Sequence, residues 1–382
     1  MLNLSKYIPA KVDYKNYAQW PALIVFCGFI FGMAAIGAFS GDNEISEYER
    51  RDLIQFPEVS VDRLTGGDFS DDYQKYLQDQ APFRDDFRFL KSFVSRNLFQ
   101  NSENNGVFVL GDTIYDRFGT INHERIDRVV RIVEEIAGDI DSDRQFVALI
   151  PTKSQALVGT KYYVPDQMEI VDKFGSMANV QAIDLAGMLE SIGPDFYYRS
   201  DPHWNAGGVV LSYNTIVDEL GLDRIFGYDS EFFTYQYFGS EYGKAAAWSI
   251  VPDAILLPRN EVIDGLVTCR YSSQEDKECV DSVYYRGAES EQDAYDVFLG
   301  GLGPIIEITN PAASTSEELV IFKDSYAHAI APLLAQHYRK VTLFDLRYMR
   351  RSVVTENFDL DGKTVLFLYS TSVLNTDSQI VN

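Results

Sequence analysis

One stretch, residues 319–334, constrains the fold more than any other, because an apolar run is followed at once by polar residues and a helix start. Leu319–Phe322 has the pattern of a strand covered on both faces, and apolar residues then recur at helical spacing from Ala327. Ser325 therefore falls on a strand-to-helix turn, where its hydroxyl can sit at the edge of a sheet beside the positive end of a helix. An alternative stays open, in which Asp324 or Ser325 is only an N-cap.

A second polar segment, residues 197–208, supplies an acid and a base. Asp201 and His203 are one residue apart, so in an extended backbone both side chains lie on the same face. Asp201 can then orient the imidazole while the other ring nitrogen takes the proton of a serine hydroxyl. Of the four histidines, His203 is the one with an acidic neighbour at this spacing. The alternative is a structural Asp–His pair that caps a helix at Asn205.

Predicted helices and strands alternate along the chain, as is typical of an α/β protein. This alternation predicts a parallel sheet with helices on both faces, and sites in that architecture gather at the carboxyl ends of strands. Lys153, the Asp201/His203 turn and Ser325 each follow a predicted strand, so we expect them to meet at one edge. The predicted helices are 122–138, 165–178 and 206–220, and the predicted strands are 145–150, 180–185, 319–323, 341–344 and 364–369.

A series of short motifs follows in order along most of the chain after residue 50. They are Arg51-Asp-Leu-Ile-Gln-Phe-Pro, Asp79-Gln-Ala-Pro-Phe-Arg, Ile150-Pro-Thr-Lys, Asp201-x-His-Trp with Asn205-x-Gly-Gly, Phe298-Leu-Gly-Gly, Phe322-Lys-Asp-Ser-Tyr-Ala, His337-Tyr and Asp345-x-Arg-Tyr. Together they resemble the DHHW family of bacterial envelope proteins, which is similar to the alginate O-acetyltransferase (AlgX/AlgJ-like) branch of the SGNH hydrolase superfamily. One departure is Pro202, which stands where the family has its first histidine.

The resemblance implies a fold, a reaction and partners. The fold is an SGNH-hydrolase-like (flavodoxin-like) α/β sheet, with Ser325 as nucleophile and Asp201 and His203 as the acid–base pair. The reaction is O-acetylation of an envelope or secreted polysaccharide, with the acetyl donor relayed by a membrane-embedded partner. If water accepts the acetyl group instead, the same site is an acetylesterase, because both reactions share the first half. A non-catalytic scaffold or glycan-binding protein is the alternative from another class, and Pro202 favours it.

Further residues near these motifs are weaker candidates for the site. The backbone N–H groups of Ser325 and Tyr326 can donate to an oxyanion, and the Asn205 side chain is another possible donor. Lys153 either contacts substrate at the strand edge or is a solvated loop charge. Trp204 either wedges the neighbouring loop or touches a sugar. The sequence has no phosphate-binding glycine loop, nucleotide fingerprint or metal-ligand cluster, so we expect neither a cofactor nor a metal.

The first sixty residues predict a membrane anchor and a linker. Residues 20–40 are uncharged and apolar over the length that crosses a bilayer, with three lysines before them and four acidic residues soon after. That asymmetry places 1–19 in the cytoplasm and the catalytic domain, 61–382, outside it, so we expect a single-pass membrane protein. A cleaved signal peptide, with a site near Ala35, is the rival interpretation. Residues 41–60 read as a linker.

Two further regions have recognisable patterns before the alternation begins. Residues 68–99 are predicted to be helical with a turn at Pro82, and their apolar faces are expected to pack in a core. Residues 106–118 alternate around Gly111-Asp112 in the manner of a hairpin.

A β-rich insertion is expected at about 224–300, where the alternation stops. Cys269 and Cys279 lie in a polar part of it, and outside the cytoplasm they can form a disulfide worth about 2–3 kcal/mol. Two lone thiols are the alternative. The many aromatic residues of this region favour core filling over a sugar-stacking surface.

The overall charge excludes one class of partner. A formal net charge of −24 and a pI near 4.5 argue against nucleic acid and against broad binding to polyanions or anionic membrane surfaces. An acidic ectodomain is consistent with a protein that acts on glycans.

Overall fold

A computed structural model describes residues 19–271, 276–290, 293–377 and 380. The chain divides into two compact units, Met1–Lys91 and Ser92–Asn382, and each is described by itself. Most of the segment expected in the cytoplasm, residues 1–18, lies outside the described residues.

The first unit begins with an apolar helix and continues with short elements. Trp20–Phe39 of α2 is long and apolar enough to span a membrane, as an anchor or as a signal sequence. Residues 41–60, expected as a plain linker, contain a small antiparallel pair in which Ile45 faces Asp52. The elements are α2 (Gln19–Phe39), β1 (Ile45–Ser46), β2 (Arg51–Asp52), α3 (Val61–Gly66), α4 (Asp68–Asp79) and the start of α5 (Arg84–Asn97).

The helices predicted over 68–99 form, but the expected burial of their apolar faces is wrong for α5. The chain breaks between α4 and α5 at Ala81–Phe83, around Pro82 as predicted. On α5 the large apolar side chains at Phe87 and Leu90 are exposed, whereas Phe89 is buried. The physical reason is that Arg84 and Arg88 of this helix form ion pairs with Glu49 in the same unit. The face that carries Phe87 and Leu90 is therefore left on the surface.

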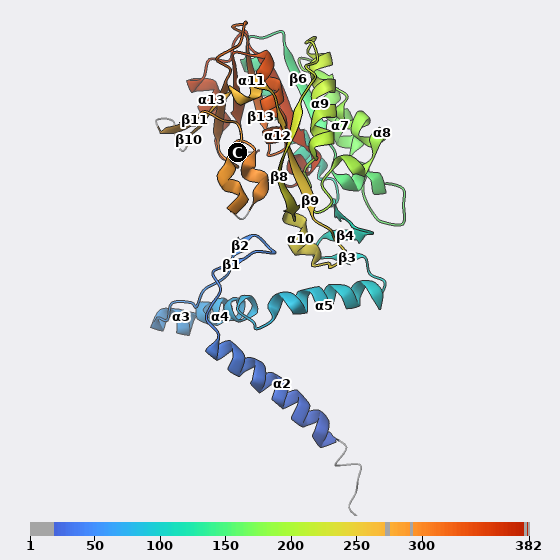
Figure 1. Cartoon of the computed structure of the whole chain (residues 1–382), viewed down its shortest axis with the longest axis vertical. Coiled ribbons are helices and arrows are strands. Elements are labelled where there is room, and N and C mark those ends of the chain that lie inside the picture. Colours follow the sequence, from blue (N-terminus) through green and yellow to red (C-terminus); the bar gives the residue numbers. More distant parts are fainter. Residues whose placement is uncertain (1–18, 272–275, 291–292, 378–379, 381–382) are drawn as a thin grey trace, which may run out of the picture. The chain divides into compact units, whose positions relative to one another are not determined.

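An eight-stranded sheet organises the second unit (Figure 1). Its order is β11-β10-β12-β14-β13-β15-β6-β7, and the five strands from β14 to β7 are parallel. β12 pairs antiparallel with β14, and β10 and β11 extend that edge. The strands are β6 (Gln145–Ile150), β7 (Gln181–Ile183), β10 (Val267–Tyr271), β11 (Lys277–Val280), β12 (Ile305–Thr309), β13 (Glu318–Lys323), β14 (Lys340–Phe344) and β15 (Thr364–Ser370).

The order of the parallel strands corrects the expectation of a plain flavodoxin-like sheet. Numbered as they occur in the chain, the five parallel strands lie in the order 2-1-5-3-4. Numbered from β13 instead, with β6 and β7 counted last, the same sheet reads 2-1-3-4-5, which is the flavodoxin-like order. The sheet is therefore a circular permutation of that fold, because β15 near the chain's end pairs with β6 in register Val365↔Gln145.

Each face of the sheet carries its own core. Along β6, Phe146 and Ala148 pack with the cluster that includes α8, α9 and α12, while Val147 and Leu149 pack with the cluster that includes α6, α7 and α14. This alternation shows a sheet covered on both faces. The helices are α6 (His123–Asp139), α7 (Met168–Gly175), α8 (Leu185–Ile192), α9 (Ala206–Glu219), α12 (Ala327–Leu334), α13 (Arg351–Asn357) and α14 (Thr371–Thr376).

The region 224–300 is β-rich, as predicted, but it does not form one separate body. β8 and β9 make a two-stranded sheet of their own, whereas β10 and β11 join the main sheet. The other elements of this region are β8 (Asp229–Tyr237), α10 (Ser240–Ala245), β9 (Asp253–Arg259), α11 (Glu261–Asp264), η4 (Arg286–Ser290) and η5 (Ala294–Val297).

Short elements also lie elsewhere in the second unit. They are β3 (Glu103–Asn104), β4 (Val107–Leu110), β5 (Thr113–Asp116), η2 (Lys153–Leu157), η3 (Pro194–Phe196) and η6 (Ala335–His337).

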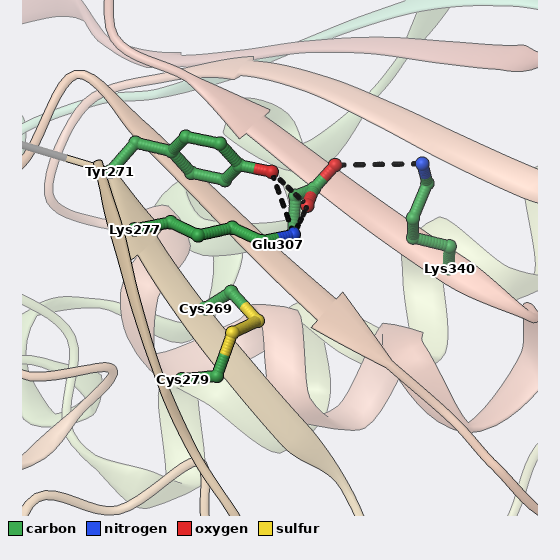
Figure 2. Close-up of a disulfide and its surroundings, with 6 residues drawn as sticks. All are labelled: Cys269, Tyr271, Lys277, Cys279, Glu307 and Lys340. Atoms are coloured by element: carbon green, nitrogen blue, oxygen red, sulfur yellow. Dashed lines mark hydrogen bonds and ion pairs between the residues drawn. A yellow bond between two sulfur atoms is a disulfide. The ribbon is translucent and has the colours of Figure 1, made fainter. Parts of the chain in front are cut away.

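A disulfide joins the β10–β11 hairpin across its two strands (Figure 2). Cys269 and Cys279 face each other in the strand register, with Cα atoms 4.0 Å apart. On the neighbouring strand, Glu307 accepts a hydrogen bond of 2.5 Å from the Tyr271 hydroxyl and lies 3.5 Å from the Lys340 ammonium. The disulfide thus closes the hairpin itself, and the Tyr271–Glu307 hydrogen bond ties the hairpin to β12.

Candidate active site

The strand-to-helix turn that follows β13 places the Ser325 hydroxyl at the carboxyl edge of the sheet. Asp324 fixes this turn: its carboxylate accepts hydrogen bonds from the N–H groups of Tyr326, at 3.0 Å, and of Ser370 at the end of β15, at 2.7 Å. Asp324 thus fixes the turn before α12, but the N-cap position of that helix is Tyr326, so neither Asp324 nor Ser325 is the N-cap. The hydroxyl of Ser325 is left to face the second polar segment.

The segment 197–205 folds back on itself and presents His203 to Ser325. Tyr197 forms a β-bridge with Trp204, and the Tyr198 N–H donates to the carbonyl of His203 at 3.0 Å. His203 Nε2 lies 2.8 Å from Ser325 Oγ, and His203 Nδ1 lies 2.6 Å from Asp201 Oδ1. Three side chains from two distant segments thus form one continuous hydrogen-bonded line.

Asp201 is a buried carboxylate whose hydrogen bonds favour its charged form. Burial acts to raise its pKa, but the His203 ring and the N–H groups of His203 and Ser240 outweigh burial, so the pKa lies below the ordinary value. The two N–H donors lie 3.1 and 2.9 Å from the carboxylate oxygens. A charged Asp201 stabilises the imidazolium that would form when His203 accepts a proton.

Two tyrosines hold the imidazole ring. The Tyr295 ring stacks on His203 with centroids 4.0 Å apart and planes 13° apart, and the Tyr326 ring lies 4.7 Å away. The Tyr326 hydroxyl also donates to the carbonyl of Pro202 at 2.6 Å. Tyr295 comes from η5 in the insertion, and sequence reasoning missed it because many tyrosines there look alike.

The possible oxyanion donors near Ser325 are not equivalent. Among the described residues the Ser325 N–H has no hydrogen-bond partner, so it is available to a developing negative charge. The Tyr326 N–H, expected to donate to the oxyanion, is already engaged by Asp324 at 3.0 Å. Asn205, the other expected donor, uses its side chain to cap α9 and to bind the carbonyls of Asp195 and Tyr197. In this geometry both groups are therefore already hydrogen-bonded within the protein.

The sequence left two roles open for Lys153, a substrate contact at the strand edge and a solvated loop charge. The structure instead buries this side chain. The residue begins the 3-10 helix η2, and its fully buried ammonium donates to the carbonyls of Tyr198 and Asp201 at 2.7 and 2.8 Å. Glu241 lies 3.4 Å away as the counter-ion. The lysine therefore supports the loop that carries the acid and the base.

Trp204 is buried, and it packs against the Tyr326 ring with centroids 5.5 Å apart. Of the two expected roles, the position matches the wedge beneath the histidine loop. A fully covered indole has no surface to offer a sugar.

A buried charged cluster behind Ser325 was not foreseen. The Lys323 ammonium lies 2.8 Å from His328 Nε2 and 3.1 Å from Asp345, which is paired in turn with Arg347 at 2.7 Å. Burial and then the neighbouring ammonium hold the pKa of His328 well below its ordinary value, so this ring is neutral. The motif Asp345-x-Arg-Tyr was the one signal in the sequence that pointed to this cluster.

The described part of the chain contains no group of three or more histidine, cysteine or carboxylate side chains arranged to hold a metal ion. The arrangement at Ser325 instead provides a hydroxyl, a base in contact with it and an acid in contact with the base, which is what nucleophilic catalysis by serine requires.

The protein is thus an α/β protein with a circularly permuted sheet, and a hydrogen-bonded Ser–His–Asp line lies at the carboxyl edge of that sheet. The chain belongs to the DHHW family: the family model described as DHHW protein matches residues 96–344. No curated protein matches the sequence.

The solved structures that are similar to this chain are distant in sequence. A DHHW family protein from Eubacterium siraeum is 18% identical, with a TM-score of 0.60 over 73% of this chain and 95% of that one. Bacillus cereus PatB1, solved with a sulfonyl adduct, is 20% identical, with a TM-score of 0.57 over 71% and 96%. The O-acetyltransferase domain of Pseudomonas putida AlgJ is 13% identical, with a TM-score of 0.43 over 71% and 92%.

Proposed function

We propose that this protein is a serine-dependent O-acyltransferase that moves an acetyl group to a hydroxyl of an envelope or secreted polysaccharide. One observation carries the proposal: Ser325 Oγ, His203 and Asp201 form a line with contacts of 2.8 and 2.6 Å. Such a line makes a serine hydroxyl nucleophilic at neutral pH.

In the first half of the reaction, Ser325 Oγ attacks the acetyl carbonyl carbon while His203 Nε2 takes the hydroxyl proton. The tetrahedral intermediate carries negative charge on oxygen, and the Ser325 N–H donates to it. The intermediate collapses when the bond to the donor's leaving group breaks, and His203 returns the proton to that group. The product is an acetyl ester on Ser325.

In the second half, a sugar hydroxyl attacks the acetyl ester while His203 takes its proton. The intermediate collapses with release of Ser325, which regains the proton from the imidazole. Throughout, Asp201 holds the ring through Nδ1 and stabilises its charged form. If water takes the place of the sugar, the product is acetate and the enzyme is an esterase.

A polar cavity of about 680 Å³ borders the segment that carries Asp201 and His203, although neither these two residues nor Ser325 lines it, and it offers room for part of a sugar chain beside the site. Arg199 and Asn205 line it from the segment itself, and the exposed ring of Tyr235 lines it from β8. A ring and several polar side chains are the groups that bind carbohydrates. The acetyl donor, by family resemblance, is supplied by a membrane-embedded partner.

The location proposed for the site is outside the cytoplasm. Lysines before α2 and acidic residues after it favour an anchor with the N-terminus inside. A cleaved signal peptide would also place the second unit outside the cytoplasm.

The test compares the full chain in detergent with its Ser325→Ala variant, using 4-nitrophenyl acetate as donor. We expect the variant to lose turnover by roughly 10⁴-fold or more, and a sulfonyl fluoride to label Ser325, as located by mass spectrometry. Ser191→Ala, at an exposed serine, is the matched control. Equal turnover in wild type and Ser325→Ala would exclude this nucleophile.

A second candidate function is a non-catalytic scaffold or glycan-binding protein, and Pro202 favours it because the family has a histidine there. The same assay separates the two. A wild-type chain that neither turns over the ester nor takes the label, yet binds polysaccharide, would establish the scaffold. Adding an oligosaccharide acceptor then separates transfer from hydrolysis, since transfer adds one acetyl group to its mass.

A further inference from the structure

Helix α5 presents an apolar stripe outward within the first unit. Phe83, Phe87 and Leu90 recur at spacings of four and three residues, so they lie on one face of the helix and of the turn before it. Their exposed fractions are 57%, 42% and 47%. In a soluble globular protein, an apolar stripe on a surface helix ordinarily faces the hydrophobic core.

Charged side chains make the internal contacts of the same helix, so its rotation is fixed. Arg84 and Arg88 both bind the Glu49 carboxylate, Arg88 at 3.0 Å. Behind them Arg51 makes two hydrogen bonds to Asp79, at 2.6 and 2.8 Å. The hydrogen bonds from Arg51 outweigh burial and lower the pKa of Asp79 to about 2, so the network stays charged at neutral pH. Turning the stripe inward would break these ion pairs.

The stripe meets the apolar surface of α2. The rings of Phe29 and Phe87 meet edge to face with centroids 6.4 Å apart. Near the end of α2, Gly37 lies beside Pro82, where an added Cβ would be 3.4 Å from the proline ring. None of the apolar window of α2 is buried within the described residues. Apolar groups of α2 and of the start of α5 therefore meet at two places, Phe29 with Phe87 and Gly37 with Pro82.

We propose that α5 lies in the lipid–water interface of the membrane, with Phe83, Phe87 and Leu90 inserted among the lipids. The occupant is lipid, because the stripe meets a helix whose length and hydropathy fit a bilayer. The inference rests on the part of the proposed function that makes α2 an uncleaved anchor. It adds a second membrane contact, which restrains the orientation of the first unit on the bilayer.

The native thiol at Cys27 allows both parts to be tested in the full chain. An environment-sensitive fluorophore on Cys27 of the chain in phosphatidylcholine vesicles reports insertion of α2, and Cys27→Ser with Phe87→Cys reports the stripe. We expect spin-labelled lipid to quench roughly half or more of the emission at both positions, as for a probe at interfacial depth or deeper. Cys27→Ser with Glu124→Cys is the matched control, since the Glu124 side chain is 86% exposed, and it should stay unquenched.

The two labelled positions test two different claims: position 27 tests whether α2 is a membrane anchor, and position 87 tests whether α5 lies in the interface. Quenching at position 27 without quenching at position 87 overturns the interfacial helix and leaves the anchor intact. No quenching at position 27 overturns both. Leu90→Ser provides a second measurement: it should leave the unfolding temperature in detergent unchanged, whereas Phe89→Ser, at a buried ring, should lower it. A drop as large for Leu90→Ser would mean that the stripe packs on protein, against the proposal.

Discussion

The backbone carbonyl of Asp201 accepts a hydrogen bond of 2.8 Å from the ammonium of Lys153, a side chain 48 residues earlier in the chain. The same ammonium lies 2.7 Å from the carbonyl of Tyr198, so one buried charge holds both ends of the loop that presents the acid. The position of Asp201, and through it of His203, thus depends on a residue that never meets substrate.

Replacing Lys153 separates its effect on folding from its effect on turnover. Above pH 7, where the Glu241 carboxyl is ionised, Lys153→Met leaves that charge buried without a counter-ion and should cost about 3–5 kcal/mol of unfolding free energy. Lys153→Met with Glu241→Gln removes both charges and should recover most of that loss. Its kcat should stay depressed with KM unchanged, because Asp201 has still lost a donor. Full kcat in the double variant would rule out a positioning role.

Asp201→Asn tests whether the acid orients the imidazole. The amide presents an N–H₂ group to His203 Nδ1, which favours the wrong ring tautomer, so we expect ester turnover to fall by roughly 10³–10⁴-fold while the fold persists. Circular dichroism checks the fold. Asp195→Asn, at an exposed carboxylate of the neighbouring helix η3, should keep full turnover. An Asp201→Asn variant as active as wild type would remove Asp201 from the mechanism.

Much of the fold was predictable because its signals are local. The strands at 145–150 and 319–323, the helix after Ser325 and the turn at Pro82 all follow from patterns of apolar residues over a few positions. The permuted strand order was not predictable, because it depends on β15 pairing with β6 across more than two hundred residues. No local pattern encodes such a pairing.

The residues of the candidate site also fall into two groups, those that the sequence could indicate and those that it could not. Asp201 and His203 stand close together in sequence, and Ser325 sits at a recognisable joint, so their chemistry could be inferred before their geometry. Lys153 and Tyr295 could not, because a lysine in a loop and a tyrosine among many have ordinary sequence contexts. Their roles arise only where the fold brings them beneath or against the histidine loop.

Gly239→Ala should displace the loop that carries Asp201. A Cβ at position 239 would lie 2.2 Å from the Asp201 Cβ and 2.5 Å from the Ser200 carbonyl oxygen, so the loop must move. A displacement of about 1 Å can cost roughly 10²-fold in turnover. Gly138→Ala, where nothing lies within 4 Å, is the matched control and should keep full activity. Unchanged turnover in Gly239→Ala would show that the loop tolerates the shift.

Reduction of the Cys269–Cys279 disulfide should lower stability without affecting turnover. The bond closes a loop with a sequence separation of 10, which is worth about 2–3 kcal/mol of unfolding free energy. Thiol titration of the unfolded, unreduced chain should find one of the three cysteines free, namely Cys27. Three reactive thiols before reduction would mean that the pair is not joined. Denaturant unfolding with and without dithiothreitol measures the effect.

The buried Glu241 carboxyl makes the stability of the fold depend on pH. Burial raises its pKa from 4.5 to about 7, and Lys153 offsets this only in part. Between pH 4.5 and 7 the unfolded chain has released this proton while the folded chain retains it, so rising pH favours unfolding. The contribution is present in full below pH 4.5 and is lost as pH passes 7, by on the order of 3 kcal/mol.

Glu241→Gln removes this proton exchange, so its unfolding free energy should fall less than that of wild type from pH 4.5 to 7. Asp116, whose pKa burial also raises, remains in the variant and retains part of the slope. Urea unfolding at several pH values, read as the difference between the two chains, isolates Glu241. Parallel curves across this window would mean that Glu241 is already ionised in the folded protein, paired with Lys153. In that case the Lys153–Glu241 pair would hold the Asp201 loop as two full charges at every pH in the window.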